Sequence, residues 1–260
     1  ELFEKKWIHE IAGNTVDTPL GPQPQAPSAS ELWTRVWGRK EITRIVSLFD
    51  AAAAAVPAGS LEARRIAFMR ENFLNPLVAE GDAKSNAMDV TKARARRTAN
   101  PPQNLLENGS FDPNGGGWGP PSGPNGYDTA TFVSGPASFR VSNPDGKGWS
   151  CCTQKMIGKF KDDTTYRISF FAKLDGVKRL KRVGHSCWAI NYYDKWYCLP
   201  GGGQTGGFLL GTADWFYYEG TFKTGKRAAD TKADPYVSWG FNGNVSGTAW
   251  VDDIVLEEVE

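Results

Sequence analysis

The sequence predicts a two-domain α + β chain, in which an N-terminal α-helical segment over residues 1–100 precedes an all-β jelly-roll sandwich over residues 103–260. In the first part, apolar residues recur at helical spacing. In the second part, short runs that alternate apolar and polar residues are separated by turn residues. Asn100-Pro101-Pro102 stands where the pattern changes, and such a proline pair favours a domain boundary. A chain of 260 residues has room for two domains of ordinary size.

The helical segment is expected to contain two long helices. Residues 1–12 show a short helical pattern, and the proline-rich residues 13–30 predict a loop or linker. Ser28-Ala-Ser-Glu31 has the pattern of a capping box and is expected to open the first long helix. Ser60 is expected to cap the second long helix, which Asn75-Pro76 should kink or end locally.

The sandwich is expected to contain about nine strands in two sheets. In the clearest strand, Thr165–Ala172, alternation places Tyr166, Ile168, Phe170 and Ala172 on the face that should form the core. A hairpin around Asp194 should join residues 184–193 to residues 195–199. Further strands are expected at residues 138–141, 215–222, 236–241 and 249–257.

The two ends of the β part carry a pair of motifs. The opening stretch Asn104–Asp112 contains Asn-Gly-Ser-Phe-Asp and is expected to be the first strand. The closing stretch Thr248–Leu256 contains Val-Asp-Asp-Ile and is expected to be the last strand and the partner of the first. With the aromatic-rich strands between them, residues 104–260 resemble the jelly-roll carbohydrate-binding modules of families 4, 9, 16 and 22. The helix at Glu31–Trp37 loosely resembles the tail that follows the barrel in bacterial glycoside-hydrolase-like proteins distantly related to α-glucuronidases.

These resemblances imply a non-catalytic polysaccharide-binding module that targets a larger enzyme to its substrate. The enzyme would be bacterial and secreted or attached to the cell surface. The chain would then be a fragment whose catalytic barrel lies upstream, and we expect it to be a monomer. The main alternative is a structural or protein-interaction jelly roll whose aromatic residues all belong to a core or an interface. A glycan-cleaving enzyme in its own right is the other alternative.

Composition and motifs argue against several other classes of function. The net charge of +1 gives no reason to expect a nucleic acid or a membrane as partner, and no apolar run approaches the roughly 20 residues that span a bilayer. Two histidines in different halves of the chain do not supply a catalytic triad. Asp252 and Asp253 are neighbours in one expected strand and should point to opposite faces, so they do not flank a sugar bond together. We therefore predict no catalytic residue.

Sugars present apolar C–H faces, and proteins bind them with flat aromatic side chains and a few polar groups. Trp118 lies in a loop rich in glycine and proline, where we expect it to be exposed. Alternation places Trp188 and Tyr192 on one face of their strand and His185 and Asn191 on the other, and the sequence leaves open which face binds sugar. The candidate aromatic residues are Trp118, Trp188, Tyr192, Trp196, Tyr217 and Trp239, with Arg182, His185 and Asn191 as polar partners; for Tyr217 and Trp239 a place in the core is the alternative.

The basic run Lys178–Arg182 precedes this hairpin. Arginine and lysine beside aromatic residues suggest an acidic glycan, uronic or sulfated, and the alternative is a solvated turn that protects a strand edge. For the four cysteines, a disulfide between Cys187 and Cys198 is preferred, with free thiols as the alternative.

In the families that the chain resembles, a structural calcium ion lies near the first and last strands. An unpaired buried carboxylate is costly, and Ca²⁺ prefers carboxylate and carbonyl oxygens. By motif position, Asp112 and Asp252 would supply carboxylates, and carbonyl groups around Asn108 and from the Gly146-Lys147 turn would complete the shell. The alternative is that Asp112 caps a turn and Asp252 pairs with a lysine.

Overall fold

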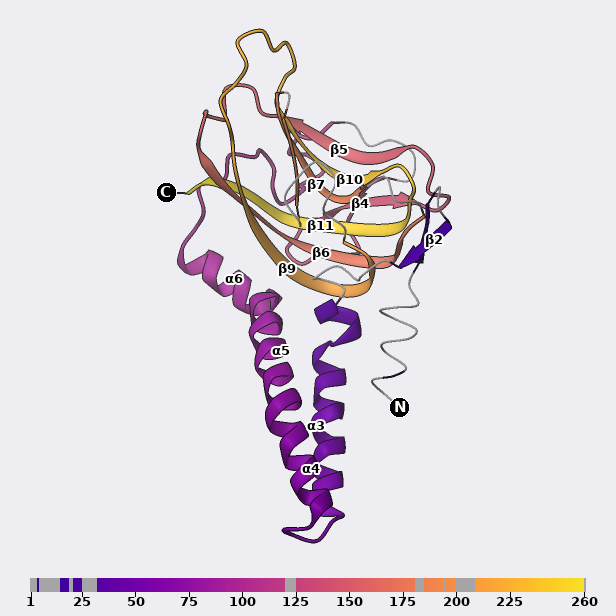
Figure 1. The fold of residues 1–260 in the computed structure, drawn as a ribbon. Coiled ribbons are helices and arrows are strands. Elements are labelled where there is room, and N and C mark those ends of the chain that lie inside the picture. Colours follow the sequence, from indigo (N-terminus) through magenta and orange to yellow (C-terminus); the bar gives the residue numbers. More distant parts are fainter. Residues whose placement is uncertain are drawn as a thin grey trace.

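Two antiparallel β-sheets pack face to face in the computed structural model, and a long helical hairpin extends from one side of them (Figure 1). The structure describes Glu4 and residues 15–18, 21–24, 32–119, 125–180, 185–193, 195–199 and 209–259. The two sheets form a β-sandwich, as the alternating pattern of the C-terminal part predicts.

The sheet beside the helices has five strands in the order β3-β4-β11-β6-β9. Its last strand in the sequence, β11, pairs with β4 on one side and with β6 on the other, so it is central. The strands are β3 Gly126–Asp128, β4 Ser138–Asn143, β6 Thr165–Arg179, β9 Gly211–Lys223 and β11 Val245–Glu258.

The second sheet has four strands in the order β5-β10-β7-β8. These are β5 Trp149–Lys155, β7 His185–Tyr192, β8 Lys195–Leu199 and β10 Tyr236–Asn242. Tyr192 in β7 lies opposite Lys195 in β8, which confirms the hairpin expected around Asp194.

The core lies between the two sheets. Tyr166, Ile168, Phe170 and Ala172 of β6 are completely buried, so the predicted core face of this strand is confirmed. Phe170 meets Trp239 of the four-stranded sheet with the ring centroids 5.7 Å apart. Burying a large apolar side chain stabilises the fold by about 1.5–3 kcal/mol, so contacts of this kind hold the two sheets together.

The opening stretch Asn104–Asp112 is irregular, and the prediction of a first strand is wrong. Asn108 and Phe111 have φ angles of 49° and 53°, which a β-strand does not accommodate. The stretch nevertheless lies beside the closing strand, as predicted. The Leu105 N–H donates to the Leu256 carbonyl at 2.7 Å, and the Asn104 side chain accepts from the Leu256 N–H at 2.9 Å.

The helical hairpin consists of α3 Arg39–Ala54, α4 Leu61–Met69 and α5 Asn75–Ala87, with π-helical turns at Leu32–Val36 and Arg70–Leu74. The Ser60 hydroxyl accepts a hydrogen bond from the Ala63 N–H at 3.1 Å, which confirms the predicted cap of the second helix. The irregularity expected at Asn75-Pro76 takes the form of the π-helical turn directly before it.

Within the stretch predicted as a loop or linker, two short strands form a hairpin. They are β1 Thr15–Thr18 and β2 Gly21–Pro24, and Thr18 lies opposite Gly21. The prediction is wrong for these eight residues, and Gly21 at the start of β2 has a φ of 94°, a conformation that glycine adopts readily.

The last helix, α6 Val90–Ala99, packs on the outer face of the five-stranded sheet. Ala93 is buried against Phe171 and Tyr217, and the Tyr217 N–H donates to the Met88 carbonyl at 2.9 Å. The Arg97 guanidinium lies over the Phe171 ring, 4.9 Å from its centroid.

Arg97 also makes the polar contacts of this junction. Its guanidinium donates to the Asp253 carbonyl and, at 2.7 Å, to the Ser169 hydroxyl. Burial lowers the pKa of this guanidinium from its usual value, although the neighbouring Tyr217 and Asp253 raise it. The helical segment and the sandwich are therefore joined by a partly buried charge.

Replacing Arg97 with methionine should lower the free energy of unfolding by about 1–3 kcal/mol, because the Ser169 hydroxyl and the Asp253 carbonyl lose a buried donor. Urea denaturation followed by tryptophan fluorescence measures the effect. Arg94→Met on the same helix is the control, since Arg94 is exposed and its replacement should change stability by less than about 0.5 kcal/mol. Equal stability of the two variants would contradict the prediction.

Candidate functional site

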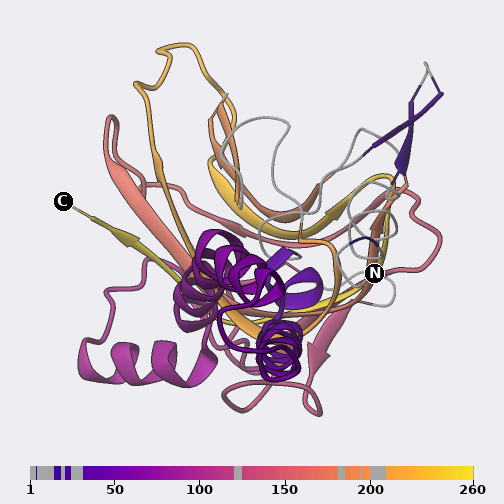
Figure 2. The same cartoon turned by 60° about the horizontal axis from the view of Figure 1, so that its bottom comes forward.

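The outer face of the four-stranded sheet carries exposed and partly exposed aromatic side chains with small side chains between them. Cys152 in β5 and Val237 and Trp239 in β10 are buried between the sheets, so the residues that alternate with them lie on the outer face. Figure 2 shows that this sheet is bent and that its outer side is turned away from the helices.

An aromatic pair stands at one end of this face. Tyr236 in β10 lies opposite Asn191 in β7, which in turn lies opposite Trp196 in β8. The rings of Trp196 and Tyr236 meet edge to face, with centroids 5.6 Å apart and planes at 85°. Both side chains are partly exposed, so this end offers aromatic surface around a polar side chain.

Trp149 stands at the other end. It is the first residue of β5 and is 60% exposed. Tyr236 lies opposite Lys155, the last residue of β5, so six residues separate the two aromatic ends. That separation corresponds to about 20 Å along a strand.

Small side chains cover the face between these ends. Thr153, Ser238 and Ala189 form one row across three strands, and Cys151 and Gly240 begin the next. Gly240 has a φ of 145°, and a Cβ atom there would approach the Ser150 carbonyl oxygen to 2.1 Å. A larger residue therefore does not fit at this position, and no large side chain projects from the middle of the face.

Asn191 supplies an unsatisfied acceptor. It is 5% exposed, and its Oδ1 atom has no hydrogen-bond partner. Leaving a buried acceptor unpaired costs about 1–3 kcal/mol, and such groups in native proteins call for an explanation. Asn191 lies between Trp196 and Tyr236 in the register, so this unpaired acceptor lies beside the aromatic pair.

Trp118 belongs to the core, and the prediction that it is exposed is wrong. It is 8% exposed, its ring stacks on Phe111 with centroids 5.1 Å apart, and its Nε1 donates to the Asn108 carbonyl at 3.0 Å. Gly116 and Gly117 have φ angles of 64° and 81°, so the chain before Trp118 turns in a way that directs the indole inward.

Tyr192, Tyr217 and Trp239 are also buried, and none of them offers a sugar platform. Tyr192 and Trp239 lie in the core between the sheets. Tyr217 lies on the outer face of the five-stranded sheet, where α6 covers it and the Arg97 guanidinium lies 5.3 Å from its ring centroid. For Tyr217 and Trp239, the alternative of a structural role is thus the correct one.

Of the predicted sugar-binding residues, Trp196 and Asn191 lie together on the outer face of the four-stranded sheet. The backbone register places Trp188 opposite Trp239 and His185 opposite Asn242. The side chains of Trp188 and His185, and the whole of Arg182, lie outside the described residues.

Sequence reasoning missed Trp149 and Tyr236. Trp149 opens the alternating run Trp149–Lys155, which was not assigned as a strand although it has the period of two that such a strand requires. Tyr236 lies in an expected strand, but its neighbours across the sheet become visible only with the register.

The described cysteines, Cys151 and Cys152, are free thiols. Burial raises the pKa of both, and more strongly that of Cys152. The side chains of Cys187 and Cys198, for which a disulfide was preferred, lie outside the described residues.

The predicted calcium ligands do not form one site. The Asp112 carboxylate accepts from the Asn114 N–H at 2.8 Å and so caps a turn, and the Asn108 amide donates to the Asp112 and Gly116 carbonyls. The Gly146 carbonyl accepts from the Asn244 N–H, at the end of β11 far from Asp252. Among the residues that the structure describes, no group of three or more His, Cys, Asp or Glu side chains is suited to a metal. A calcium requirement therefore stays a prediction.

Asp252 is completely buried and is held by backbone donors rather than by a lysine. Its Oδ2 accepts from the N–H groups of Val133 at 2.7 Å and Ser134 at 2.9 Å, and its Oδ1 accepts from the Asp253 N–H at 2.7 Å. Burial raises its pKa to about 7, although the N–H donors of Ser134 and Val133 act in the opposite direction. The carboxyl group therefore ties the loop before β4 to the central strand.

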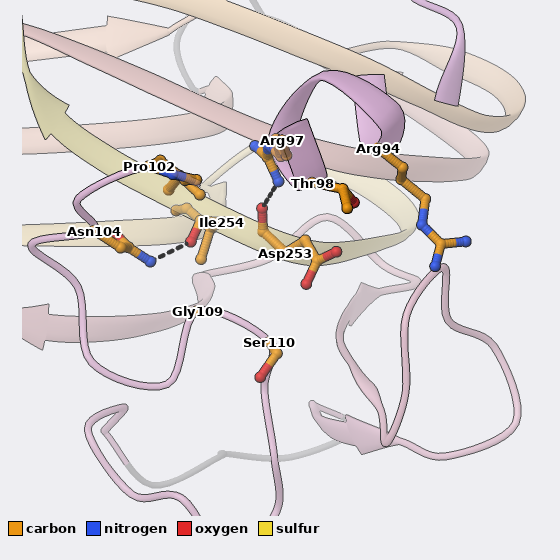
Figure 3. Close-up of a pocket in the computed structure, with 10 residues that line it drawn as sticks. Arg94, Arg97, Thr98, Pro102, Asn104, Gly109, Ser110, Asp253 and Ile254 are labelled. Atoms are coloured by element: carbon orange, nitrogen blue, oxygen red, sulfur yellow. Dashed lines mark hydrogen bonds between the residues drawn. The ribbon is translucent and has the colours of Figure 1, made fainter. Parts of the chain in front are cut away.

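A cavity of about 460 Å³ opens between α6, the opening stretch and β11. In Figure 3, Arg97 reaches the Asp253 carbonyl and the Asn104 amide reaches the Ile254 carbonyl, so the groups on this side of the cavity are engaged in holding the junction together. Its lining contains no aromatic side chain, which sets it apart from the outer face of the four-stranded sheet.

Comparisons with known proteins place the β part in a family. A family model described as a carbohydrate binding domain matches residues 103–244. Among solved structures, the chain is similar to Family 16 Carbohydrate Binding Module-2, with 22% identity over 60% of this chain and 100% of that one and a TM-score of 0.40. Among curated proteins, none matches the chain.

Two family 22 modules are similar as well. The CBM22-1 xylan-binding domain from Paenibacillus barcinonensis Xyn10C has 13% identity over 61% of this chain and 96% of that one, with a TM-score of 0.38. The C-terminal family 22 carbohydrate binding module of Clostridium thermocellum Xyn10B has 17% identity over 61% of this chain and 97% of that one, with a TM-score of 0.41.

Replacing Trp118 with alanine should lower the free energy of unfolding by about 3–5 kcal/mol, because it removes a buried aromatic side chain from the core. Urea denaturation measures the loss. Trp149→Ala is the matched control, since Trp149 is 60% exposed and its removal should leave stability nearly unchanged. A Trp118→Ala variant as stable as the Trp149→Ala variant would place Trp118 at the surface after all.

The raised pKa of Asp252 predicts a pH dependence of stability. Between its ordinary value of 3.8 and about 7, the folded state keeps a proton that the unfolded chain has lost. This group therefore favours the folded state most below about pH 4, and its contribution declines as the pH rises to about 7.

The test compares urea midpoints of the protein and of Asp252→Asn across this pH range. The variant should be less stable throughout, because its amide N–H₂ faces backbone N–H donors, but its stability should decline less with pH. Parallel curves would show that Asp252 titrates normally.

Proposed function

Because the chain belongs to the family of carbohydrate-binding domains through residues 103–244, we propose that it binds a polysaccharide on the outer face of its four-stranded sheet. The observation that carries this proposal is the arrangement of that face. The Trp196–Tyr236 pair and Trp149 stand at its two ends, with small side chains between them.

Each part of the face suits a property of a sugar. Aromatic rings pack against the apolar C–H face of a pyranose, and the indole of Trp149, which is 60% exposed, offers surface for that contact. At the other end, the Oδ1 atom of Asn191 has almost no exposed surface, so the partly exposed rings of Trp196 and Tyr236 would make the contact with the sugar. Between the two ends, Thr153 is exposed and Cys151 is partly exposed, and the ligand would pass over these small side chains.

The spacing of the two ends favours a chain over a single sugar. A separation of about 20 Å exceeds the length of one sugar ring, whereas an extended oligosaccharide of several units spans it. We therefore propose that the face binds an extended segment of a linear polysaccharide, which contacts both aromatic ends at once.

Such binding would serve a linked enzyme. A module that holds a polysaccharide raises the local substrate concentration for any active site joined to it, without adding a catalytic group itself. We propose this targeting role in a secreted or cell-surface bacterial enzyme. None of the helices in the described residues is long and apolar enough to cross a membrane.

In its more specific form, the proposal is that the bound polysaccharide is acidic. The segments around Gly148, Leu180 and Asn244 meet at the end of the sandwich that carries Trp149, since the Leu180 N–H donates to the Asn244 carbonyl and the Gly243 N–H to the Gly148 carbonyl. The basic run Lys178–Arg182 thus begins near that aromatic end. A uronic or sulfated chain that lay across Trp149 would pass close to this charge.

Affinity gel electrophoresis with neutral, uronic and sulfated polysaccharides tests the proposal. The protein should be retarded by at least one class, and Trp149→Ala and Trp196→Ala should each raise the dissociation constant at least about tenfold, or ~1.4 kcal/mol. If the ligand is acidic, added salt should weaken binding steeply, because screening acts on exposed charges.

Phe132→Ala is the matched control. Phe132 is 41% exposed, but it precedes Val133, which packs with Phe171 on the opposite sheet. This variant should bind like the unaltered protein. Failure of every polysaccharide to bind would favour the alternative of a structural or protein-interaction jelly roll.

A further inference from the structure

The helical hairpin carries an apolar surface that the sandwich does not cover. Of the nine large apolar side chains that are well exposed in the described part of the chain, five lie between residues 48 and 73. The most exposed of these is Phe68, at 63%. Soluble proteins seldom leave such residues grouped unless the surface takes part in binding.

These side chains lie along one side of α4 and the adjoining side of α3. Leu61, Phe68 and Met69 are separated by seven and eight residues, which places them on the same helical face. Leu48 on α3 is 52% exposed beside them. A groove of about 350 Å³ runs between the two helices, lined by Ile45, Leu48, Phe49, Ala52, Ile66 and Met69, with Arg65 at its edge.

The two helices bury few side chains within the chain itself. None of the nine residues of α4 is buried, and α3 buries only Ile42 and Ile45. Helices of this length draw most of their stability from packing of an apolar face. Figure 1 shows that the far end of the hairpin points away from both sheets, so no strand of the sandwich reaches this face.

We propose that a second copy of this chain covers this face, so that two helical hairpins pair about a two-fold axis into a four-helix bundle. In such an isologous contact, the same surface must supply both the projection and the recess that receives it. This surface offers both, because Phe68 projects from α4 and the next residue, Met69, lines the groove between α3 and α4. Phe68 of each copy would enter the groove of the other.

The surface area and charge support this occupant. If each side chain presents roughly 200 Å² when fully exposed, Leu48, Leu61, Phe68 and Met69 expose about 400 Å² per copy. Each partner buries about 800 Å² in a standard interface, so these four side chains supply half of that area. The groove walls and the polar rim add to it. The rim carries both signs of charge, including the Asp50–Arg70 ion pair, so two copies would meet without a block of like charges.

The bundle differs from the monomer that the sequence leads one to expect, and it does not depend on sugar binding. Sedimentation velocity of the 260-residue chain over a range of concentrations tests it. The chain should sediment at twice its mass of 28.5 kDa. Phe68→Asp and Leu48→Asp should each raise the dimer dissociation constant at least about tenfold, because each would bury a carboxylate in an apolar groove.

Phe132→Asp is the matched control, since Phe132 is also exposed but lies on the sandwich. It should leave the dimer intact. Near-ultraviolet circular dichroism of the Phe68→Asp variant should match that of the unaltered protein, and its retention by polysaccharide should be unchanged, which separates this inference from the proposed function. A chain that sediments as a monomer at every concentration overturns the proposal, as does a dimer that Phe68→Asp leaves intact.

Discussion

The central strand β11 is the element on which the rest of the structure depends, and the residues in its second half make most of the contacts to other segments. At Asp252 the strand binds the loop before β4 through two N–H groups of that loop, and at Asp253 its carbonyl accepts from the partly buried guanidinium of Arg97. The pairing between β11 and β6 shifts between Asp252 and Val255, and this irregularity frees these backbone groups for contacts outside the ladder. One interrupted stretch of strand thus anchors a loop, a helix and, through Ile254 and Leu256, the opening segment.

The regular parts of this fold could be predicted from the sequence because their periodicity is local. Thr165–Ala172 alternates strictly, and its core face is confirmed. The opening stretch was wrongly predicted as a strand because of its apolar residues. Its course is set instead by Asn108 and Phe111, which have left-handed conformations, and by a side-chain hydrogen bond to β11. Left-handed conformations at Gly116 and Gly117 turn Trp118 inward, so a tryptophan in a glycine-rich loop becomes a core residue.

The candidate site could be predicted only in part, since alternation defines two faces of a strand without saying which one is exposed. Asn191 and Trp196 were candidates, but Tyr236 joins them through a register that brings together residues forty or more positions apart. Tyr217 shows the converse, because its strand position is outward and only the packing of α6 covers it. Where one element covers another, the exposure of a side chain is a tertiary property that strand pattern does not contain.

The position of the helices determines whether the proposed binding face stays accessible. The hairpin extends from the side of the five-stranded sheet, whereas the proposed binding face is the outer side of the other sheet (Figures 1 and 2). A bundle formed by two hairpins would therefore leave both binding faces open. Two faces held in one particle can bind the same polysaccharide, and the second contact is then effectively intramolecular. Modest affinity at each face would suffice for firm attachment, because dissociation requires both faces to release together.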